Sequence, residues 1–117
     1  MFHKRQGCVF KEYLLFIETP VFSRDRADLL TDDEFRKLQE HLLKNHEQGS
    51  TISATGGCKK IRWQREGMGK SGGVRIIYYT ITKTGRLYLL LIYPKNKKDD
   101  LTPKEKEVLK AISNKLQ

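Results

Sequence analysis

Two strand-like runs decide the fold of this chain: Gly73-Val-Arg-Ile-Ile-Tyr-Tyr79 and Leu87-Tyr-Leu-Leu-Leu-Ile-Tyr93. Between them, Lys83-Thr-Gly85 is typical of a hairpin turn, because glycine readily adopts the positive φ that such turns need. The second run is apolar on both faces, which predicts a central strand covered on each side. A third run, Lys59-Lys-Ile-Arg-Trp63, alternates cationic and apolar side chains, so Ile61 and Trp63 share one face and Lys60 and Arg62 the other. We therefore predict three antiparallel strands, at about 58–65, 73–82 and 86–93.

Helix signals lie on both sides of these strands. Thr31-Asp-Asp-Glu34 has the form of a capping box and opens an amphipathic helix to about Asn45. A second box, Thr102-Pro-Lys-Glu105, opens the last helix, with proline at its first position. Further along each helix the apolar stripes are Phe35, Leu38 and Leu42 in the first, and Val108, Leu109, Ile112 and Leu116 in the second.

The remaining segments are shorter. Tyr13 to Ile17 has the length and composition of a strand, Pro20 to Leu30 of a short helix, and Gly49 to Gly57 of a small-residue loop. Residues 1–12 show no period and look like a loose N-terminal extension. With 117 residues, we expect one domain at 13–117 behind that extension. Its fold class is α+β: a small, mainly antiparallel sheet with helices packed on it.

Composition limits the function classes. The chain holds 23 Lys+Arg against 14 Asp+Glu, a net charge of +9, which favours nucleic acid, an anionic membrane or an acidic protein as partner. The longest apolar run has only the seven residues of Leu87 to Tyr93, far below the roughly 20 needed to span a bilayer. No signal-peptide pattern begins the chain. We therefore expect a cytoplasmic protein with no membrane partner.

Cysteine and histidine spacing favours neither a disulfide scaffold nor a metal site. Cys8 and Cys58 lie far apart, as expected of two reduced thiols. The three histidines are too scattered to form a metal cluster with them: His3, His41 and His46. We expect neither a metal nor a cofactor.

Positive charge concentrates within the predicted sheet, on Lys60, Arg62, Arg75 and Lys95. Like charges on one face of a sheet repel, and a bound phosphate would relieve that repulsion. The alternative is a solvated outer sheet face. If the ends of the antiparallel strands meet at one rim, these four groups converge there.

The connection from Arg65 to Gly73 is glycine-rich and basic, so Lys70 and glycine amides can approach a sugar-phosphate backbone. A plain solvated hairpin loop is the alternative. Gly69-Lys-Ser71 does not form a P-loop, because Gln64 stands where the motif requires a glycine, five positions before Gly69. In addition, strand sequence follows Ser71, where the motif requires a helix. The four tyrosines of the predicted sheet are more often packing residues than base-stacking platforms: Tyr78, Tyr79, Tyr88 and Tyr93.

These motifs resemble the HigB-like branch of the RelE toxin superfamily. The resemblance rests on Gly57-Cys-Lys-Lys-Ile-Arg62, Gly67-Met-Gly-Lys-Ser-Gly-Gly73, Arg75-Ile-Ile-Tyr-Tyr79 and Leu89-Leu-Leu-Ile-Tyr-Pro-Lys-Asn96. Phe16-Ile-Glu-Thr-Pro-Val-Phe22 and Asp99-Asp-Leu-Thr-Pro-Lys-Glu105 extend it. In order and spacing it covers about residues 13–115.

The resemblance implies a RelE/ParE-like α+β fold and the toxin of a type II toxin–antitoxin pair. It also implies a metal-independent, ribosome-dependent mRNA endoribonuclease that blocks translation. Expected partners are a nearby-encoded antitoxin, of helix-turn-helix type, together with the ribosome and mRNA. Operator DNA would be bound only through the antitoxin complex.

Carried over by position, the family's catalytic cations fall on Lys60, Arg62, Arg75 and Lys95, with Asn96 as the poorer match for the last of them. Where that family has an arginine and a tyrosine in its C-terminal region, this chain has Asn96 and Thr102, so Tyr93 or Lys95 is the expected substitute. The residues that we expect to contact RNA around this centre are Lys59, Arg65, Lys70, Tyr93, Asn96, Lys97 and Lys98.

RNA cleavage without metal needs a base for the 2′-OH, charge stabilisation and an acid for the leaving oxygen. Arg62 and Arg75 suit charge stabilisation, and Lys60 is the expected base because neighbouring cations favour loss of its proton. Lys95 is the expected acid or phosphate anchor. Two alternatives remain open: a ParE-like inhibitor of a protein target such as gyrase, and a basic nucleic-acid-binding module without turnover.

Overall fold

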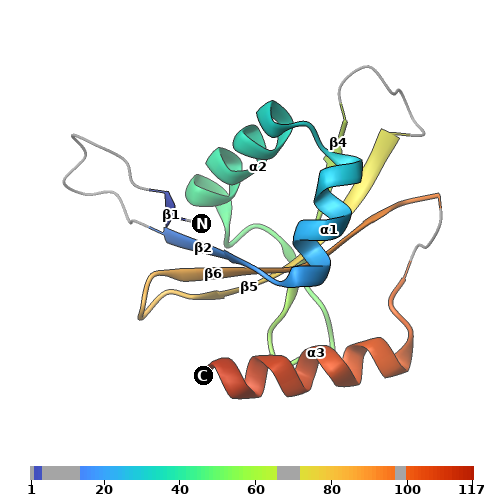
Figure 1. The fold of residues 1–117 in the computed structure, drawn as a ribbon. Coiled ribbons are helices and arrows are strands. Elements are labelled where there is room, and N and C mark those ends of the chain that lie inside the picture. Colours follow the sequence, from blue (N-terminus) through green and yellow to red (C-terminus); the bar gives the residue numbers. More distant parts are fainter. Residues whose placement is uncertain (1, 4–13, 66–71, 97–99) are drawn as a thin grey trace.

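The sheet at the centre of the molecule has the strand order β1-β2-β6-β5-β4-β3 (Figure 1). The computed structural model describes residues 2–3 (backbone only), 14–65, 72–96 and 100–117. Within these ranges the strands are β1 (Phe2–His3), β2 (Leu14–Glu18), β3 (Ser50–Thr51), β4 (Lys59–Gln64), β5 (Gly73–Ile81) and β6 (Arg86–Pro94). The helices are α1 (Pro20–Leu29), α2 (Asp32–Asn45) and α3 (Pro103–Leu116). None of these helices, in the part of the chain that is described, is long and apolar enough to cross a bilayer.

The three predicted antiparallel strands are confirmed as β4, β5 and β6, and the α+β class with them. The β5–β6 hairpin turns at Gly85, whose φ of 69° is the positive value that the sequence predicted. β6 is central, since β2 pairs with its other edge in parallel orientation. Two short strands were not predicted. β1 pairs with β2 inside the segment interpreted as a loose extension, and β3 pairs with β4 inside the 49–57 loop. Strands of two residues show no alternation, so pairing alone defines them.

Capping fixes where the three helices begin. Thr31 accepts a hydrogen bond from the Glu34 amide at 3.1 Å, and the Glu34 carboxylate accepts one from the Thr31 amide at 2.9 Å. The same reciprocal pair forms between Thr102 and Glu105, so both predicted capping boxes are confirmed. α1 begins after Thr19, whose hydroxyl accepts a hydrogen bond from the Phe22 amide. Each cap satisfies an amide that has no partner within its own helix.

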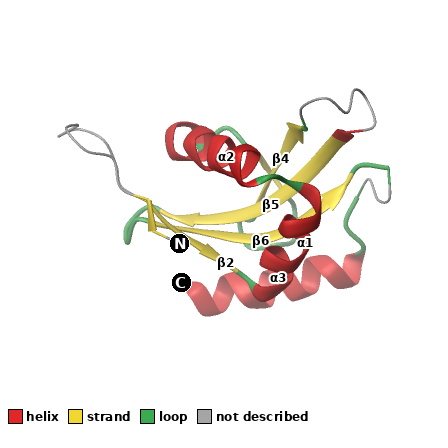
Figure 2. Ribbon diagram, turned by 45° about the horizontal axis from the view of Figure 1, so that its top comes forward, coloured by secondary structure: helices red, strands yellow, loops and turns green. Residues whose placement is uncertain are grey.

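Helices cover both faces of the sheet, with α1 and α2 on one face and α3 on the other (Figures 1 and 2). The α1/α2 face buries Phe35, Leu38 and Leu42, as predicted, and Ile61 and Trp63 of β4 pack against the same cluster. The opposite face packs on α3 through a separate cluster. The predicted α3 stripe holds for Leu109, Ile112 and Leu116. Val108 is 52% exposed, so its assignment to the core was wrong.

A β-bulge interrupts β6. Its register with β5 passes from Tyr78↔Leu89 to Ile77↔Leu91, which leaves Leu90 as an extra residue. Leu89 packs in the α1/α2 cluster, whereas both Leu90 and Leu91 pack in the α3 cluster. The alternation of β6 therefore reverses at this point, as a bulge requires.

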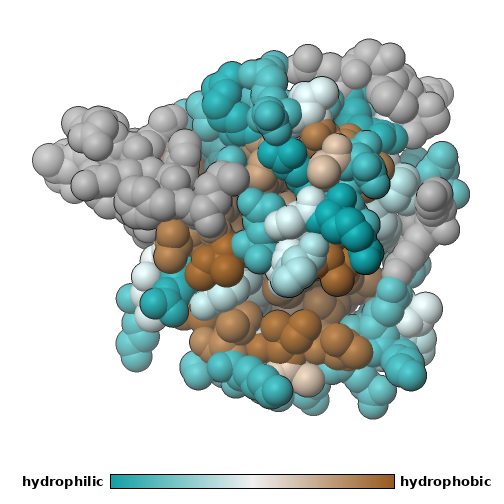
Figure 3. Space-filling model, viewed as in Figure 1, coloured by the Kyte–Doolittle hydropathy of each residue, from teal (hydrophilic) through white to brown (hydrophobic). Residues whose placement is uncertain are grey.

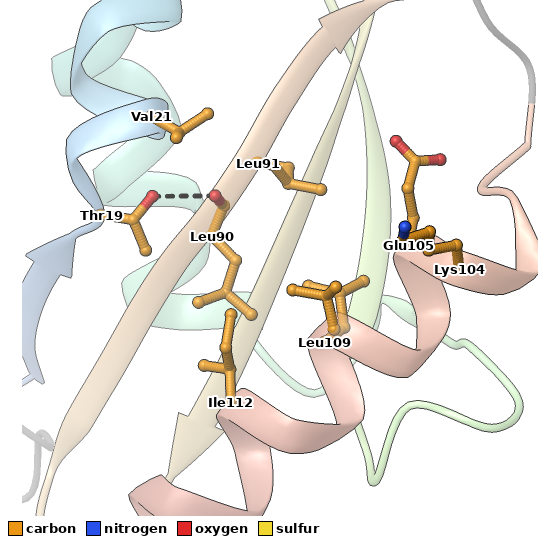
Figure 4. A pocket seen from close by; sticks show the side chains of 9 residues that line it. Thr19, Val21, Leu90, Leu91, Lys104, Glu105, Leu109 and Ile112 are labelled. Atoms are coloured by element: carbon orange, nitrogen blue, oxygen red, sulfur yellow. Dashed lines mark hydrogen bonds between the residues drawn. The ribbon is translucent and has the colours of Figure 1, made fainter.

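Thr19 holds the bulge in place. Its hydroxyl donates a hydrogen bond of 2.9 Å to the Leu90 carbonyl (Figure 4). Its amide donates one of 3.1 Å to the Leu89 carbonyl. Leu90 is 3% exposed, so its carbonyl has little access to water, and this side-chain bond supplies a partner. One hydroxyl thus caps α1 and anchors the irregular point of β6.

An apolar groove of about 270 Å³ lies between the start of α1, the bulge of β6 and α3 (Figure 4). Figure 3 shows apolar side chains gathered on this side of the molecule. Val21 and Val108, which are 41% and 52% exposed, line the groove. They are the exposed large hydrophobic residues of the described part of the chain.

Candidate functional site

The ends of three neighbouring strands lie together at one end of the sheet, where β4 ends, β5 begins and β6 ends (Figure 1), and cationic residues lie at or directly beside these ends. Arg62 of β4 stands opposite Arg75 of β5, and Arg75 stands opposite Tyr93 of β6. Two residues further toward that end of the sheet, the Lys95 amide donates a 3.0 Å hydrogen bond to the Gly73 carbonyl. Lys60 lies two residues before Arg62 on β4, opposite Ile77. We call Lys60, Arg62, Arg75 and Lys95 the cationic cluster.

All four members lie on the face of the sheet that carries α3. Directly paired residues point to the same side of a sheet, and residues two apart on one strand do so as well. Ile77, which is paired with Lys60 and is two residues from Arg75, packs in the α3 cluster. Lys95 follows the same geometry, because a Cβ built on Gly73 would lie 3.9 Å from the Lys95 Cβ and Cδ. The Lys95 stem therefore lies beside Gly73, on the same face as Arg75.

Hydrogen-bond alternation shows how closely the two arginines approach. The Arg65 amide donates to the Gly72 carbonyl at 3.2 Å, so odd-numbered residues of β4 bond to β5. Arg62 and Arg75 are consequently a non-hydrogen-bonded pair, the type in which Cα atoms lie only about 4.5 Å apart. The Cα atoms of Arg62 and Arg75, which carry the two guanidinium groups, are therefore as close together as those of any directly opposed pair in an antiparallel sheet.

Arg75 is buried, with 6% of its surface exposed, and the structure assigns it no carboxylate at ion-pair distance among the described residues. A buried charge without a counter-charge is unfavourable, and a bound anion is one way to compensate it. Within the same ranges, Lys60 is the cluster member with an acidic partner: its Nζ lies 3.9 Å from Asp100 Oδ1. Asp100 was not among the predicted site residues. Asp100 lies in the connection between β6 and α3, where no strand or helix period predicts the direction of a side chain.

The bulge of β6 brings Tyr93 and Lys95 to this site. Counted from Leu87 without interruption, strict alternation would put Tyr93 on the α1/α2 face with Leu87 and Leu89. The extra residue Leu90 reverses the order, so Tyr93 packs on the α3 face opposite Arg75. Bulges near functional sites commonly re-aim side chains in this way.

Several predicted RNA-contacting residues lie away from the cluster. The Lys59 ammonium donates to the Thr51 hydroxyl at 3.1 Å, and the Arg65 Nε donates to the Gly72 carbonyl at 2.7 Å. Lys59 is an odd-numbered residue of β4, so the alternation directs it to the α1/α2 face. Arg65 follows β4 directly and lines a pocket with residues of α1 and the start of α2. The structure brings neither of them into the cluster. Asn96 is exposed in the turn after β6. The predicted contacts Lys70, Lys97 and Lys98 lie outside the described residues.

The remaining titratable groups near the sheet serve packing. Tyr78 and Tyr79 are buried, as expected of packing tyrosines, and the Tyr78 hydroxyl donates to the His46 carbonyl at 2.7 Å. Burial raises the pKa of Tyr78 and also that of the free thiol Cys58. Cys8 lies outside the described residues. Within the described ranges no three His, Cys, Asp or Glu side chains gather as a ready set of metal ligands.

Comparison with known protein families assigns the chain. The family model for the RelE toxin of the RelE/RelB toxin–antitoxin system matches residues 19–117. That range contains every element from α1 to α3 and the whole cationic cluster, and it covers far more than half of the chain. The chain therefore belongs to the RelE toxin family: it is the toxin of a toxin–antitoxin system, which implies a cognate antitoxin as its partner.

Proposed function

We propose that this toxin is an endoribonuclease that cuts mRNA on the ribosome, without a metal, by attack of a 2′-OH on the adjacent phosphate. The observation that supports this is the cationic cluster, with the buried guanidinium of Arg75 at its centre. An RNA phosphate would supply a counter-charge for Arg75, which has no carboxylate at ion-pair distance among the described residues. The HigB-like branch of the family remains a prediction from the sequence motifs.

The cluster offers groups for each chemical task of the cleavage. Attack of the 2′-oxygen on phosphorus forms a crowded, dianionic phosphorane, and its equatorial oxygens need positive charge. Arg62 and Arg75 suit this role, because guanidinium forks match phosphate oxygens and stay protonated. The bond to the 5′-oxygen then breaks, and Lys95 is our candidate to protonate that oxygen or to hold the phosphate. Products are a 2′,3′-cyclic phosphate and a 5′-hydroxyl.

Lys60 is our candidate for the base that takes the 2′-OH proton. Asp100 lies beside it at 3.9 Å, so Lys60 has a carboxylate as well as cations for neighbours, contrary to the purely cationic surroundings expected from the sequence. Asp100 is 88% exposed and can exchange its lysine partner for solvent when RNA arrives. Either Lys60 as neutral amine or Asp100 as carboxylate can accept the proton, with Lys60 in the second case holding the phosphate.

The same charge distribution bears on partners. A toxin with a net charge of +9 gains from an antitoxin whose acidic or helix-forming segment covers the cationic cluster. Such cover would block RNA by occupying the phosphate position. We expect operator binding by the pair to depend on the antitoxin for most of its DNA contacts.

The test compares alanine variants in a cell-free translation reaction and in growing cells. Lys60→Ala and Arg75→Ala should each abolish growth inhibition and mRNA cleavage, while far-ultraviolet circular dichroism remains that of the parent protein. Arg86→Ala is the matched control, because Arg86 is an exposed cation of the same sheet at the opposite end of β6. The control should cut mRNA as the parent does.

The rival functions predict other results. An inhibitor of gyrase would stop supercoiling and leave mRNA intact. A nucleic-acid-binding module would bind free RNA in a salt-sensitive way, without cleavage or growth inhibition. Full toxicity of both Lys60→Ala and Arg75→Ala would contradict the assignment of the cationic cluster.

A further inference from the structure

An open pocket of about 570 Å³ lies beside the cationic cluster, at the outer edge of β4. Lys60 and Arg62 belong to both the pocket and the cluster. Its other walls are His41 of α2 and the turn from Gln48 to Ser50 that leads into β3. The volume is within the range of about 300–1,000 Å³ that is typical of small-molecule sites. A molecule held by the cluster on the α3 face can therefore reach this pocket around the outer edge of β4.

The edge of β4 presents backbone hydrogen-bonding groups on the side of the pocket. β3 pairs with Lys59 and Lys60 only, and no other described strand continues the pairing along β4. Even-numbered residues of β4 direct their amide and carbonyl away from β5. The 2.8 Å hydrogen bond from the Ile52 amide to the Cys58 carbonyl agrees, because it makes Ser50 and Lys60 a hydrogen-bonded pair in the same register. The N–H and C=O of Arg62 therefore point out of the open edge. A donor and an acceptor side by side complement the hydrogen-bonding edge of a nucleobase.

Side chains of three types surround this edge. Gln48 and Ser50 are exposed, and each can donate and accept hydrogen bonds. The His41 ring packs on Trp63, with ring centroids 5.4 Å apart and planes at 57°. This contact holds an aromatic ring at the pocket wall, where a base can stack on it.

Gly49 keeps the turn wall close to the core. A Cβ on Gly49 would lie 2.3 Å from the Tyr78 hydroxyl oxygen, so only glycine allows this approach. The Tyr78 hydroxyl is itself fixed by its hydrogen bond to the His46 carbonyl. The wall that carries Gln48 and Ser50 is thus positioned by the buried interior of the protein.

We propose that this pocket binds one nucleobase of the RNA, next to the phosphate held by the cationic cluster, and so contributes to the choice of cleavage position. The proposal rests on the proposed function, since it makes the pocket a subsite of the same centre. The Arg62 backbone and Gln48 read the hydrogen-bonding edge of the base, and His41 supplies the stacking surface. Arg62 joins the two parts, with its backbone at the pocket and its side chain at the phosphate.

The first experiment maps cleavage positions by sequencing the 5′ ends of mRNA fragments from translation reactions. Gln48→Ala should change the distribution of bases at one position beside the cut by about fivefold or more, because a lost hydrogen-bonding contact relaxes discrimination. Glu47→Ala is the matched control, an exposed neighbour in the same turn that does not line the pocket. It should give the parent distribution. Identical distributions for Gln48→Ala and the parent would overturn the proposal.

The second experiment tests the pocket without cleavage. Nucleoside 5′-monophosphates are titrated into the ¹⁵N-labelled full chain, with ribose 5-phosphate as the ligand that lacks a base. The monophosphates should shift the amide signals of Gln48, Ser50 and Arg62, whereas ribose 5-phosphate should leave the Gln48 and Ser50 signals in place. Equal shifts with both ligands, or none with either, would refute a base site. If the monophosphates bind but the parent cuts no mRNA, the proposed function fails and the base site stands.

Discussion

Replacement of Thr19 by valine removes one hydroxyl that makes two separate contacts. As the N-cap of α1, the Thr19 hydroxyl accepts a hydrogen bond from the Phe22 amide at 3.0 Å. The same hydroxyl donates a hydrogen bond of 2.9 Å to the Leu90 carbonyl at the bulge. Valine has nearly the same shape as threonine, so the change deletes hydrogen bonds without opening a cavity. The bulge of β6 should lose its anchor, and α1 should lose its N-terminal cap.

The magnitude follows from the two contacts. Loss of a threonine N-cap lowers stability by about 1 kcal/mol. The Leu90 carbonyl is buried, and depriving a buried polar group of its partner costs about 1–3 kcal/mol more. Thr19→Val should therefore lower the free energy of unfolding by about 2–4 kcal/mol. This is a large fraction of the roughly 5–15 kcal/mol that holds a small domain folded.

Urea unfolding at equilibrium measures this loss, and Thr31→Val is the matched control. Thr31 caps α2 through its hydroxyl, in the same way, but anchors no bulge. Thr31→Val should lower the free energy of unfolding by only about 1 kcal/mol. Thr19→Ser keeps the hydroxyl and should stay close to the parent. If Thr19→Val and Thr31→Val were equally stable within error, the bulge anchor would contribute nothing and the reasoning would be refuted.

Three further predictions concern the sheet. Arg62→Gln removes a like charge opposite Arg75 and should raise the free energy of unfolding by about 0.5–1 kcal/mol at low salt, with a smaller gain at high salt. Urea unfolding at two salt concentrations checks this, and a lower free energy of unfolding at low salt would contradict it. Tyr78→Phe removes the buried 2.7 Å bond to the His46 carbonyl and should lower stability by about 1–2 kcal/mol, measured by urea unfolding; an unchanged midpoint would count against that bond. Burial raises the pKa of Cys58, so the unfolded chain releases this proton at lower pH than the folded chain does. Stability should therefore be intact below about pH 8.5 and decline above it, and Cys58→Ala should make that decline shallower in a series of thermal melts; an identical decline would exclude the thiol as its source.

Local sequence signals predicted the elements that repeat a pattern or carry a cap. The alternation of Lys60, Ile61, Arg62 and Trp63 assigned each side chain to the correct face of β4, because side-chain direction along a strand has a period of two. Both Thr-x-x-Glu boxes marked true helix starts, since capping depends on residues only three apart. The same signals missed β1 and β3, which are defined by partners and not by their own residues. They also misplaced Val108, whose exposure depends on how far α3 lies from the sheet.

The sequence by itself determined the α+β class, the family and the presence of cations in three adjacent strands. The tertiary structure decided which cations meet. Arg62 and Arg75 share one face through the register of β4 with β5. Lys95 joins them only because β6 carries an extra residue at Leu90, and Thr19, 71 positions away in the chain, holds that residue. The parallel pairing of β2 with β6, the burial of Arg75 and the outward amide of Arg62 are likewise products of register. Register depends on contacts between distant segments, and a shift of one residue turns every following side chain to the other face.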